Sequence, residues 1–502
     1  MKRRRNIFVA VVLLLCALAA LVFIPHYRAK ARLEAYRQQL RAAGEKLEVN
    51  ELAPQKPEGE NGAMDFWAAA SASADVGKAA SAVSRMILPG KAQAGWQRKV
   101  ATEEFGTLKI TTNLWPILAA AISLKQGDLF ALHEALHRPA FYFPLDYSKG
   151  AELLMPHLAF VRQGFQELES LFLFNMHEGK TNEAWDNLMD LTLLTQKSKG
   201  EPLFISQMTR IADFSMASQT VWAALEYHGW TDAQLETLQR DWEAMEMKPE
   251  TADAVAMERA FSLERYADAR ISRAKFEDYV EVKKMGEIAE AVLTNPRNGW
   301  QAFLSRYPRY WMWQWVWSYD DEHWLTETWQ LEKDQILAPH FLKSTRAEEE
   351  PDPKFPLSHG QTYSKYVKAA FRPLTQAQLV STAIALERYR RHEGQYPASL
   401  NLLVPQFIKK MPLDYMDGQP LRYHRNTIGT FLLYSIGMDE KDDGGDSISP
   451  INRKPSFSNG RDWVWPQSAT EDEVAVFENG QKKNIPPISV EEKYREVIHA
   501  DQ

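Results

Sequence analysis

The chain has 502 residues, enough for about three folding units of ordinary size. Hydrophobic residues make up 45% of the chain and charged residues 25%, a balance that excludes intrinsic disorder and a protein that crosses a membrane many times. The net charge is −7, and residues 1–33 hold seven lysines and arginines and no acid, so removing those seven leaves −14 on the rest. This acidity argues against nucleic acid as a partner. The single cysteine, Cys16, excludes an intramolecular disulfide and any metal site built from several cysteines.

The N-terminus predicts a membrane anchor. Four basic residues at 2–5 precede an apolar run at 7–24, and a helix of that length spans about 27 Å, close to the hydrocarbon core of a bilayer. No small-residue cleavage site follows, so an uncleaved signal anchor is favoured over a cleaved signal peptide or a buried core helix. We therefore expect a single-pass inner-membrane protein that contacts the membrane through residues 7–24, with its bulk on the extracytoplasmic side.

The pattern of composition and periodicity predicts a mainly α protein with a small α+β domain at its C-terminus. In the helical body, short breaks between apolar-periodic segments predict antiparallel helical hairpins, and almost nothing alternates like a strand. Thr231 and Gln234 have the spacing of a capping box, which predicts a helix start. The sequence has no 34-residue repeat that would support a solenoid. The expected division is an anchor and stalk helix (1–47), a linker (48–62), the helical body (63–345), an acidic, proline-containing linker (346–373), a C-terminal head (374–465) and a tail (466–502).

The head begins with a predicted helix over 375–393, opened by a second capping box at Thr375 and ended by Gly394. An ordered series of short motifs follows. They are Gly-Gln-Tyr-Pro at 394–397, Met-Pro-Leu-Asp at 411–414, Asp-Gly at 417–418, an alternating strand at 431–434, Ser-Ile-Gly-Met-Asp at 435–439 and a short predicted strand at 463–464.

In order and spacing, these motifs resemble the globular head of the major pseudopilin of type II secretion, over residues 374–465. The chain departs from that family in lacking its leader site and its N-terminal glutamate, and Met416 stands where the family has an aromatic residue. We therefore expect a pseudopilin-like domain that serves for binding or assembly, and we do not expect the chain to be a subunit of a fibre. The whole chain is also similar to a group of bacterial membrane-anchored proteins without an established activity that place such a head after a helical body with stretches like 143–147.

Acidic residues gather in one loop of the head. Asp439, Asp442, Asp443 and Asp446 surround two glycines directly after a strand, and hard oxygen ligands on a flexible loop suit Ca²⁺. The pseudopilin resemblance implies Asp439 as a calcium ligand and adds Asp462, which opens the last strand. The alternative interpretation is a solvated acidic turn that binds no metal.

A second candidate site lies in the body. His133, Glu134 and His137 match the zincin pattern, in which two histidines one helical turn apart hold Zn²⁺ and the glutamate activates water. Pro139 ends the helix soon afterwards, and no Glu-x-x-x-Asp helix that could supply a third ligand is evident downstream. The alternative is a chance match, with an acid on a helix surface and two interfacial histidines.

The densest aromatic stretch spans residues 311–329, and the helical character of its second half predicts a helix with tryptophans on more than one face. These side chains serve either core packing or a surface for a protein, lipid or carbohydrate partner. Their positions are Trp311, Trp313, Trp315, Trp317, Trp324 and Trp329.

Together these patterns favour a non-enzymatic, membrane-anchored extracytoplasmic scaffold or binding protein with a pseudopilin-like, calcium-binding head. Its protein or cell-surface partner would bind through the tryptophan-rich stretch 311–329 or through the head. The alternative function is a membrane-anchored zinc metallopeptidase that uses residues 133–137.

Overall fold

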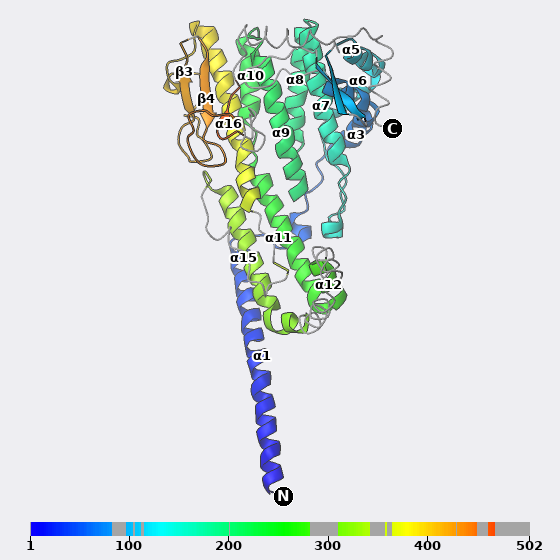
Figure 1. Cartoon of the computed structure of the whole chain (residues 1–502), viewed down its shortest axis with the longest axis vertical. Helices are drawn as coiled ribbons and strands as arrows, with labels where there is room; N and C mark the ends of the chain where they lie inside the picture. The colour runs from blue at the N-terminus through cyan, green and yellow to red at the C-terminus, as the bar shows by residue number, and fades with distance from the viewer. Residues whose placement is uncertain are drawn as a thin grey trace.

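The computed structural model describes residues 2–82, 97–103, 106–111, 115–199, 201–281, 310–341, 357–358, 364–427, 429–448 and 460–466. This described part is mainly helical and includes a small three-stranded sheet, as the composition predicted. Figure 1 shows an elongated molecule in which long helices stand side by side and α1 extends from the lower end as a stalk. Most of the predicted linker at 346–373 and nearly all of the tail at 466–502 lie outside the described residues.

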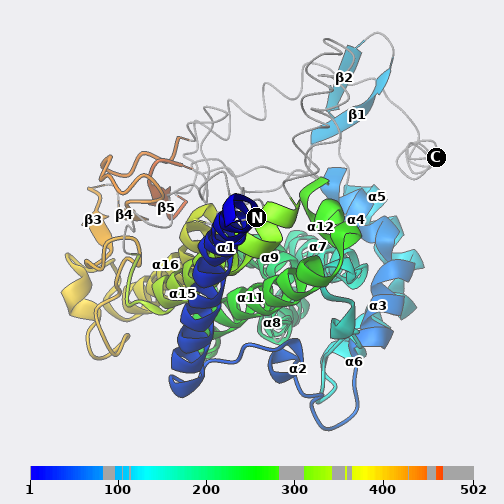
Figure 2. The same ribbon diagram turned by 90° about the horizontal axis from the view of Figure 1, so that it is seen from below.

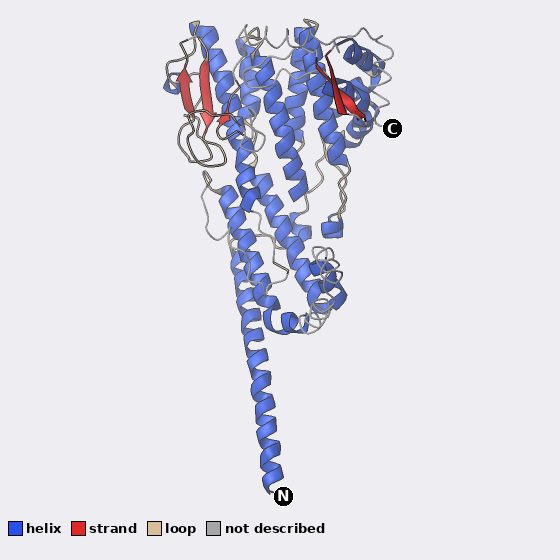
Figure 3. Cartoon of the chain, in the orientation of Figure 1, coloured by secondary structure: helices blue, strands red, loops and turns tan. Residues whose placement is uncertain are grey.

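Helices build the stalk, the body and the first part of the head (Figure 3). Their bounds are α1 Lys2–Ala42, α2 Val49–Leu52, α3 Ala63–Ala72, α4 Ala74–Ala82, α5 Trp115–Leu124, α6 Gln126–Leu136, α7 His157–His177, α8 Thr181–Lys197, α9 Phe204–Leu225, α10 Asp232–Glu243, α11 Lys248–Ile271, α12 Arg273–Glu281, α15 Ser318–Leu337 and α16 Ser364–Glu393. Short 3₁₀ segments lie at Tyr147–Glu152 and Leu400–Leu403, and a π-helical segment lies at Trp313–Trp317.

The predicted antiparallel hairpins form the body. α7 and α8 are joined by a tight turn in which Gly179 has a φ of +71°, a left-handed conformation that favours glycine. The two helices pack through fully buried side chains such as Phe165 and Leu188, which belong to one large hydrophobic core. The capping box before α10 is confirmed, because the Thr231 hydroxyl accepts from the Gln234 amide at 3.2 Å while the Gln234 side chain contacts the Thr231 amide.

One β-hairpin in the body was not predicted. Strands β1 (Gln97–Glu103) and β2 (Gly106–Thr111) pair antiparallel, with Gln97 opposite Thr111 and Glu103 opposite Gly106. In both Figure 1 and Figure 2 this hairpin and the three-stranded sheet of the head lie on different flanks of the bundle. The expectation that residues 63–345 contain almost no strand is therefore wrong for 97–111.

α1 is one continuous helix of 41 residues that includes the whole apolar run 7–24. Within the described residues, no helix carries a stretch long and apolar enough to cross a bilayer. The prediction of a membrane-spanning signal anchor is therefore wrong. The apolar run continues without a break into a basic, polar segment, and its end packs on protein, with the Phe23 ring 5.5 Å from the Trp315 ring. The expectation that the main part of the chain lies on the extracytoplasmic side was based on that anchor. It stays a prediction.

Asp321, in the first turn of α15, is fully buried and gathers donors from several segments. Its carboxylate accepts hydrogen bonds from the Tyr266 hydroxyl at 2.7 Å and the Trp313 indole at 2.8 Å. The backbone amides of Leu357 and Ser358 donate to the same carboxylate at 3.3 and 3.2 Å. Burial raises the pKa of Asp321, and these hydrogen bonds oppose that shift by favouring the charged form.

The next residue, Glu322, is also fully buried and binds α1 to the body. Its carboxylate pairs with Arg37 of α1 and, at 2.5 Å, with Arg270 of α11. A more exposed pair, Arg32 with Asp320 at 2.7 Å, joins the same two helices nearby. The upper half of α1 is thus fixed along α15, as the view from below shows (Figure 2).

The head sheet has the strand order β3 (Arg422–Arg425), β4 (Phe431–Ser435), β5 (Trp463–Val464), all antiparallel. It packs on α16, which begins at Ser364 and not at the predicted cap Thr375. Val367 and Phe371 are buried in the core, so apolar packing extends the helix past Pro373 toward its N-terminus.

Hydrogen bonds hold the head against the body. The Gln239 side chain of α10 donates to the Phe407 carbonyl at 2.7 Å, and the Trp222 indole of α9 donates to the Pro466 carbonyl at 2.9 Å. Arg388 of α16 pairs with Asp232 at 2.9 Å. These contacts join the head to the bundle as one packed structure.

Replacing the buried acid of α15 tests this arrangement. Asp321→Ala leaves the Tyr266 hydroxyl, the Trp313 indole and two amides without their acceptor, so we expect the free energy of unfolding to fall by more than about 3 kcal/mol. The neighbouring Asp320→Ala removes a partly exposed ion pair and should change it by less than about 1 kcal/mol. Urea denaturation followed by tryptophan fluorescence compares the two variants, and equal losses would contradict this role of Asp321.

Candidate metal centre

Two histidines at the end of α6 share one carboxylate of α8. His133 Nδ1 lies 2.7 Å from Asp190 Oδ2, and His137 Nε2 lies 2.7 Å from Asp190 Oδ1. The two imidazole rings have their centroids 4.4 Å apart. Residues four apart lie on one face of a helix, which is why both rings reach the same side chain. The structure thus brings the predicted His133 and His137 together and adds Asp190.

Buried leucines position the two helices. Leu132 and Leu136 on α6 and Leu188 and Leu191 on α8 are fully buried in the same core. Asp190 lies between the leucines of α8 with its side chain only 5% exposed, whereas the two histidine side chains are 42% and 49% exposed. A buried carboxylate is destabilising unless it is paired, so the two imidazoles compensate for its burial.

The arrangement offers a donor set for a metal ion. In the part of the chain that the structure describes, this is the one group of three or more His, Cys, Asp or Glu residues whose ligand atoms all lie within 4.8 Å of one another. Two imidazole nitrogens and one carboxylate are a set that binds Zn²⁺ and leaves a fourth position for water. Tetrahedral zinc ligands lie about 3.3 Å apart, so the two contacts of 2.7 Å must open by about half an ångström. The half-exposed rings can make that movement on the solvent side.

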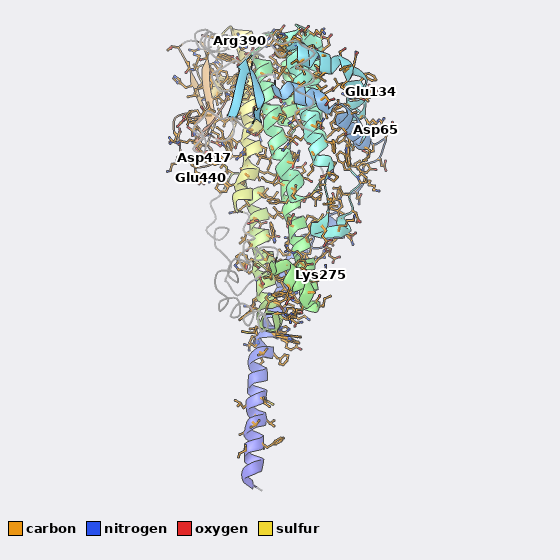
Figure 4. All side chains as sticks on the ribbon, turned by 45° about the vertical axis from the view of Figure 1, so that its right-hand side comes forward. Asp65, Glu134, Lys275, Arg390, Asp417 and Glu440 are labelled. Atoms are coloured by element: carbon orange, nitrogen blue, oxygen red, sulfur yellow. The ribbon has the colours of Figure 1, made fainter. Side chains whose placement is uncertain are left out.

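Glu134, the predicted general base, lies outside this group. Its side chain is exposed, and it lies at the outer edge of the bundle on the same flank as Asp65 (Figure 4). A general base must reach the water that it activates, directly or through one other water. The geometry therefore supports the two histidines as ligands more strongly than it supports Glu134 as a base.

Asp190 is the residue that the sequence analysis missed. The zincin pattern predicts a third ligand from a helix with the spacing Glu-x-x-x-Asp, and α8 lacks that spacing. A different signal was present, because Asp190 is the one charged residue in the apolar stretch 188–196. An acid on the buried face of a helix requires a partner, and this requirement points to a nearby basic group or metal.

The loop of the head uses its aspartates differently. Asp439, Asp442 and Asp446 each accept a hydrogen bond from the backbone amide two residues further on, at 3.2, 3.0 and 2.9 Å. Asp442 also accepts from the Tyr434 hydroxyl at 3.0 Å, and Asp446 pairs with Arg461 at 3.2 Å. These carboxylates therefore accept from backbone amides of their own loop and from side chains of the adjoining segments.

Asp462 holds this loop against the sheet. Its buried carboxylate accepts from the amides of Asp443, Gly445 and Asp446 at 3.4, 2.7 and 3.1 Å. Burial raises the pKa of Asp462, and the three amides oppose that shift. Among the described residues, no three of the five predicted calcium ligands form a group like that of His133, His137 and Asp190. Calcium binding at this loop stays a prediction.

The tryptophan-rich stretch lies on helix, with a π-helical segment at Trp313–Trp317 that leads into α15. Trp313 and Trp329 are fully buried, whereas Trp311 is 55% exposed. Trp315 packs on α1 through Phe23 and His26. The stretch therefore combines core packing, contact with α1 and a small exposed surface.

Comparison of the chain with protein-family models, with curated proteins and with solved structures found no match. The resemblance of residues 374–465 to the pseudopilin head therefore stays a prediction. Function has to be argued from the geometry of the sites themselves.

Proposed function

We propose that this chain is a non-enzymatic scaffold and binding protein whose body holds one divalent transition-metal ion, preferably Zn²⁺, through His133, His137 and Asp190. The observation that carries the proposal is the convergence of these three donors from two helices within 4.8 Å. A zinc ion there replaces the shared protons and joins the end of α6 to the middle of α8. Its main effect is on stability, because it binds the folded chain and not the unfolded one.

The rival function is a zinc metallopeptidase. The observation that favours it is the exposure of both histidines, which leaves the remaining coordination position of the metal toward solvent. The outward position of Glu134 weighs against it, since the mechanism requires a base next to the bound water (Figure 4). We therefore place the structural role first.

Zinc analysis of the purified chain tests the metal centre. After treatment with a chelator and titration with Zn²⁺, we expect one tightly bound ion per chain, because two imidazoles and a carboxylate are preassembled. His133→Ala and Asp190→Ala should each lose that ion. At a hundredfold excess of zinc over its dissociation constant, unfolding of the parent should cost about 2.7 kcal/mol more than in the metal-free chain. A parent chain without stoichiometric zinc contradicts the proposal.

Glu134→Gln separates the two functions. It lies between the ligands but outside the donor group, so the variant should bind zinc and resist unfolding like the parent. Peptide hydrolysis that depends on zinc in the parent and disappears in Glu134→Gln, with zinc retained, would establish the peptidase instead. Absence of hydrolysis in both proteins agrees with the scaffold.

The head is the second candidate binding module, for assembly or for a protein or cell-surface partner. Its support is the attachment of the head to α9 and α10 through hydrogen bonds from Trp222 and Gln239, with the aspartate loop on the opposite side of the molecule from Glu134 (Figure 4). The exposed Trp311 and Met312 of the tryptophan-rich stretch offer a further surface for a partner. The head sheet lies on the opposite flank of the bundle from α6, which carries His133 (Figure 1).

Calcium should stabilise the head if the loop binds it. The expected result is a higher unfolding midpoint when Ca²⁺ is added to the metal-free full-length chain, because a divalent cation relieves repulsion among the loop carboxylates. The double variant Asp443→Ala, Asp446→Ala should lose this shift, and Glu393→Ala, at the end of α16, should keep it. Differential scanning calorimetry makes the comparison. An equal shift with Mg²⁺, or none with Ca²⁺, would leave the solvated acidic turn as the correct interpretation.

A further inference from the structure

A cavity of about 530 Å³ lies between the segment 53–57, the segment 141–148 and the helices α7, α8 and α9. Its volume is in the range of sites that enclose a small organic molecule. None of the three proposed metal ligands lines it. It is therefore a separate feature of the body, independent of the metal proposal.

One wall of the cavity is apolar and aromatic. Phe141, Phe143 and Val161 contribute to it, and the Phe143 ring stacks on the His157 ring with centroids 4.3 Å apart. His157 is fully buried, and its Nε2 lies 2.8 Å from Glu201 Oε1. This wall can pack against an aromatic or aliphatic group, and His157 lies directly beside one acid of the lining, Glu201.

The other acids of the lining also have partners inside the protein. Asp213 is bound by Arg162 at 2.9 Å. Asp146 accepts hydrogen bonds from the amide and the hydroxyl of Ser148 at 3.2 and 2.5 Å. Asp213 is therefore paired with a cation of the chain, and Asp146 is bound by hydrogen bonds of its own turn.

The cations of the lining are not paired in this way. Lys56 and Lys199 form no ion pair within the part of the chain that the structure describes, and Lys197 donates to a backbone carbonyl. The fourth cation, Arg210, has its closest carboxylate oxygen, on Glu250, at 4.0 Å. The lining thus has more unpaired positive charge than negative charge.

Arg210 makes this imbalance significant because it is buried. Its side chain is only 4% exposed, and its Nε and Nη1 have no hydrogen-bond partner among the described residues. Burial lowers the pKa of Arg210 to about 10, so the guanidinium is still charged at neutral pH. In a poorly hydrated environment, the field of such a cation favours an anion nearby.

We propose that this cavity binds a small organic anion, with a carboxylate or phosphate group attached to an apolar or aromatic body. The anionic group supplies counter-charge for the three lysines and for Arg210, whose carboxylate partner Glu250 lies at 4.0 Å, and the apolar body packs on the wall of Phe141, Phe143 and Val161. Arginine recognises carboxylates and phosphates well, because its guanidinium presents several donors in a fixed fork that binds two of their oxygens at once.

A matched pair of probes tests the proposal by titration calorimetry on the full-length chain. 2-Naphthoate carries the anion and the aromatic body, and 2-naphthamide has the same body without charge. We expect naphthoate to bind at least about tenfold more tightly than naphthamide. Inorganic phosphate alone should bind weakly, because it lacks the apolar body. Equal affinity for the two naphthyl probes, no binding of either, or phosphate binding as tight as naphthoate would each overturn the proposal.

Two variants locate the binding. Arg210→Gln keeps hydrogen-bond donors but removes the charge, and should abolish the preference for naphthoate. The double variant Lys56→Glu, Lys199→Glu changes two exposed residues, so it leaves the core of the protein intact. It should weaken naphthoate binding by about tenfold. The matched control Lys409→Glu, Lys410→Glu, on exposed lysines of the head, should leave it unchanged. Unchanged naphthoate affinity in the cavity variants, or an equal loss in the control, would place the probe elsewhere and contradict the assignment.

Discussion

The arrangement of the helices depends on two adjacent carboxylates that are buried in the first turn of α15. Asp321 collects donors from α11, from the π-helical segment and from residues 357–358, and Glu322 collects an arginine from α1 and another from α11. A charge taken out of water is tolerated only when donors surround it, so the positions of these segments relative to α15 are tightly constrained. The large core around α9 and α11 is then built on that fixed frame.

Asp190 shows the same physics with a different outcome. The side-chain donors to Asp321 are buried in the core. The two imidazoles that contact Asp190 are instead half-exposed at the surface. Imidazole binds either a proton or a metal ion, so the same buried carboxylate can be compensated in two ways. That difference is why a functional role is assigned to Asp190 and a structural one to Asp321.

Local patterns predicted much of the fold. The capping box at Thr231 and the strands around 431–434 and 463–464 depend on side chains close in sequence, and the structure has them. The start of α16 was misplaced, because burial of Phe371 against distant helices outweighs the local cap. The hairpin at 97–111 was missed because the helical periodicity of its surroundings was extended over it, although Leu108 and Ile110 alternate with polar residues. The group of His133, His137 and Asp190 was half predicted, because helical spacing aligns two histidines but says nothing about the helix that packs against them.

Diffraction at the zinc absorption edge, from crystals of the zinc-loaded chain, locates the bound ion. We predict one strong anomalous peak per chain, at bonding distance from His133 Nδ1, His137 Nε2 and a carboxylate oxygen of Asp190. Absence of a peak between α6 and α8, or a peak bound elsewhere while the two imidazoles stay hydrogen-bonded to Asp190, would contradict this prediction.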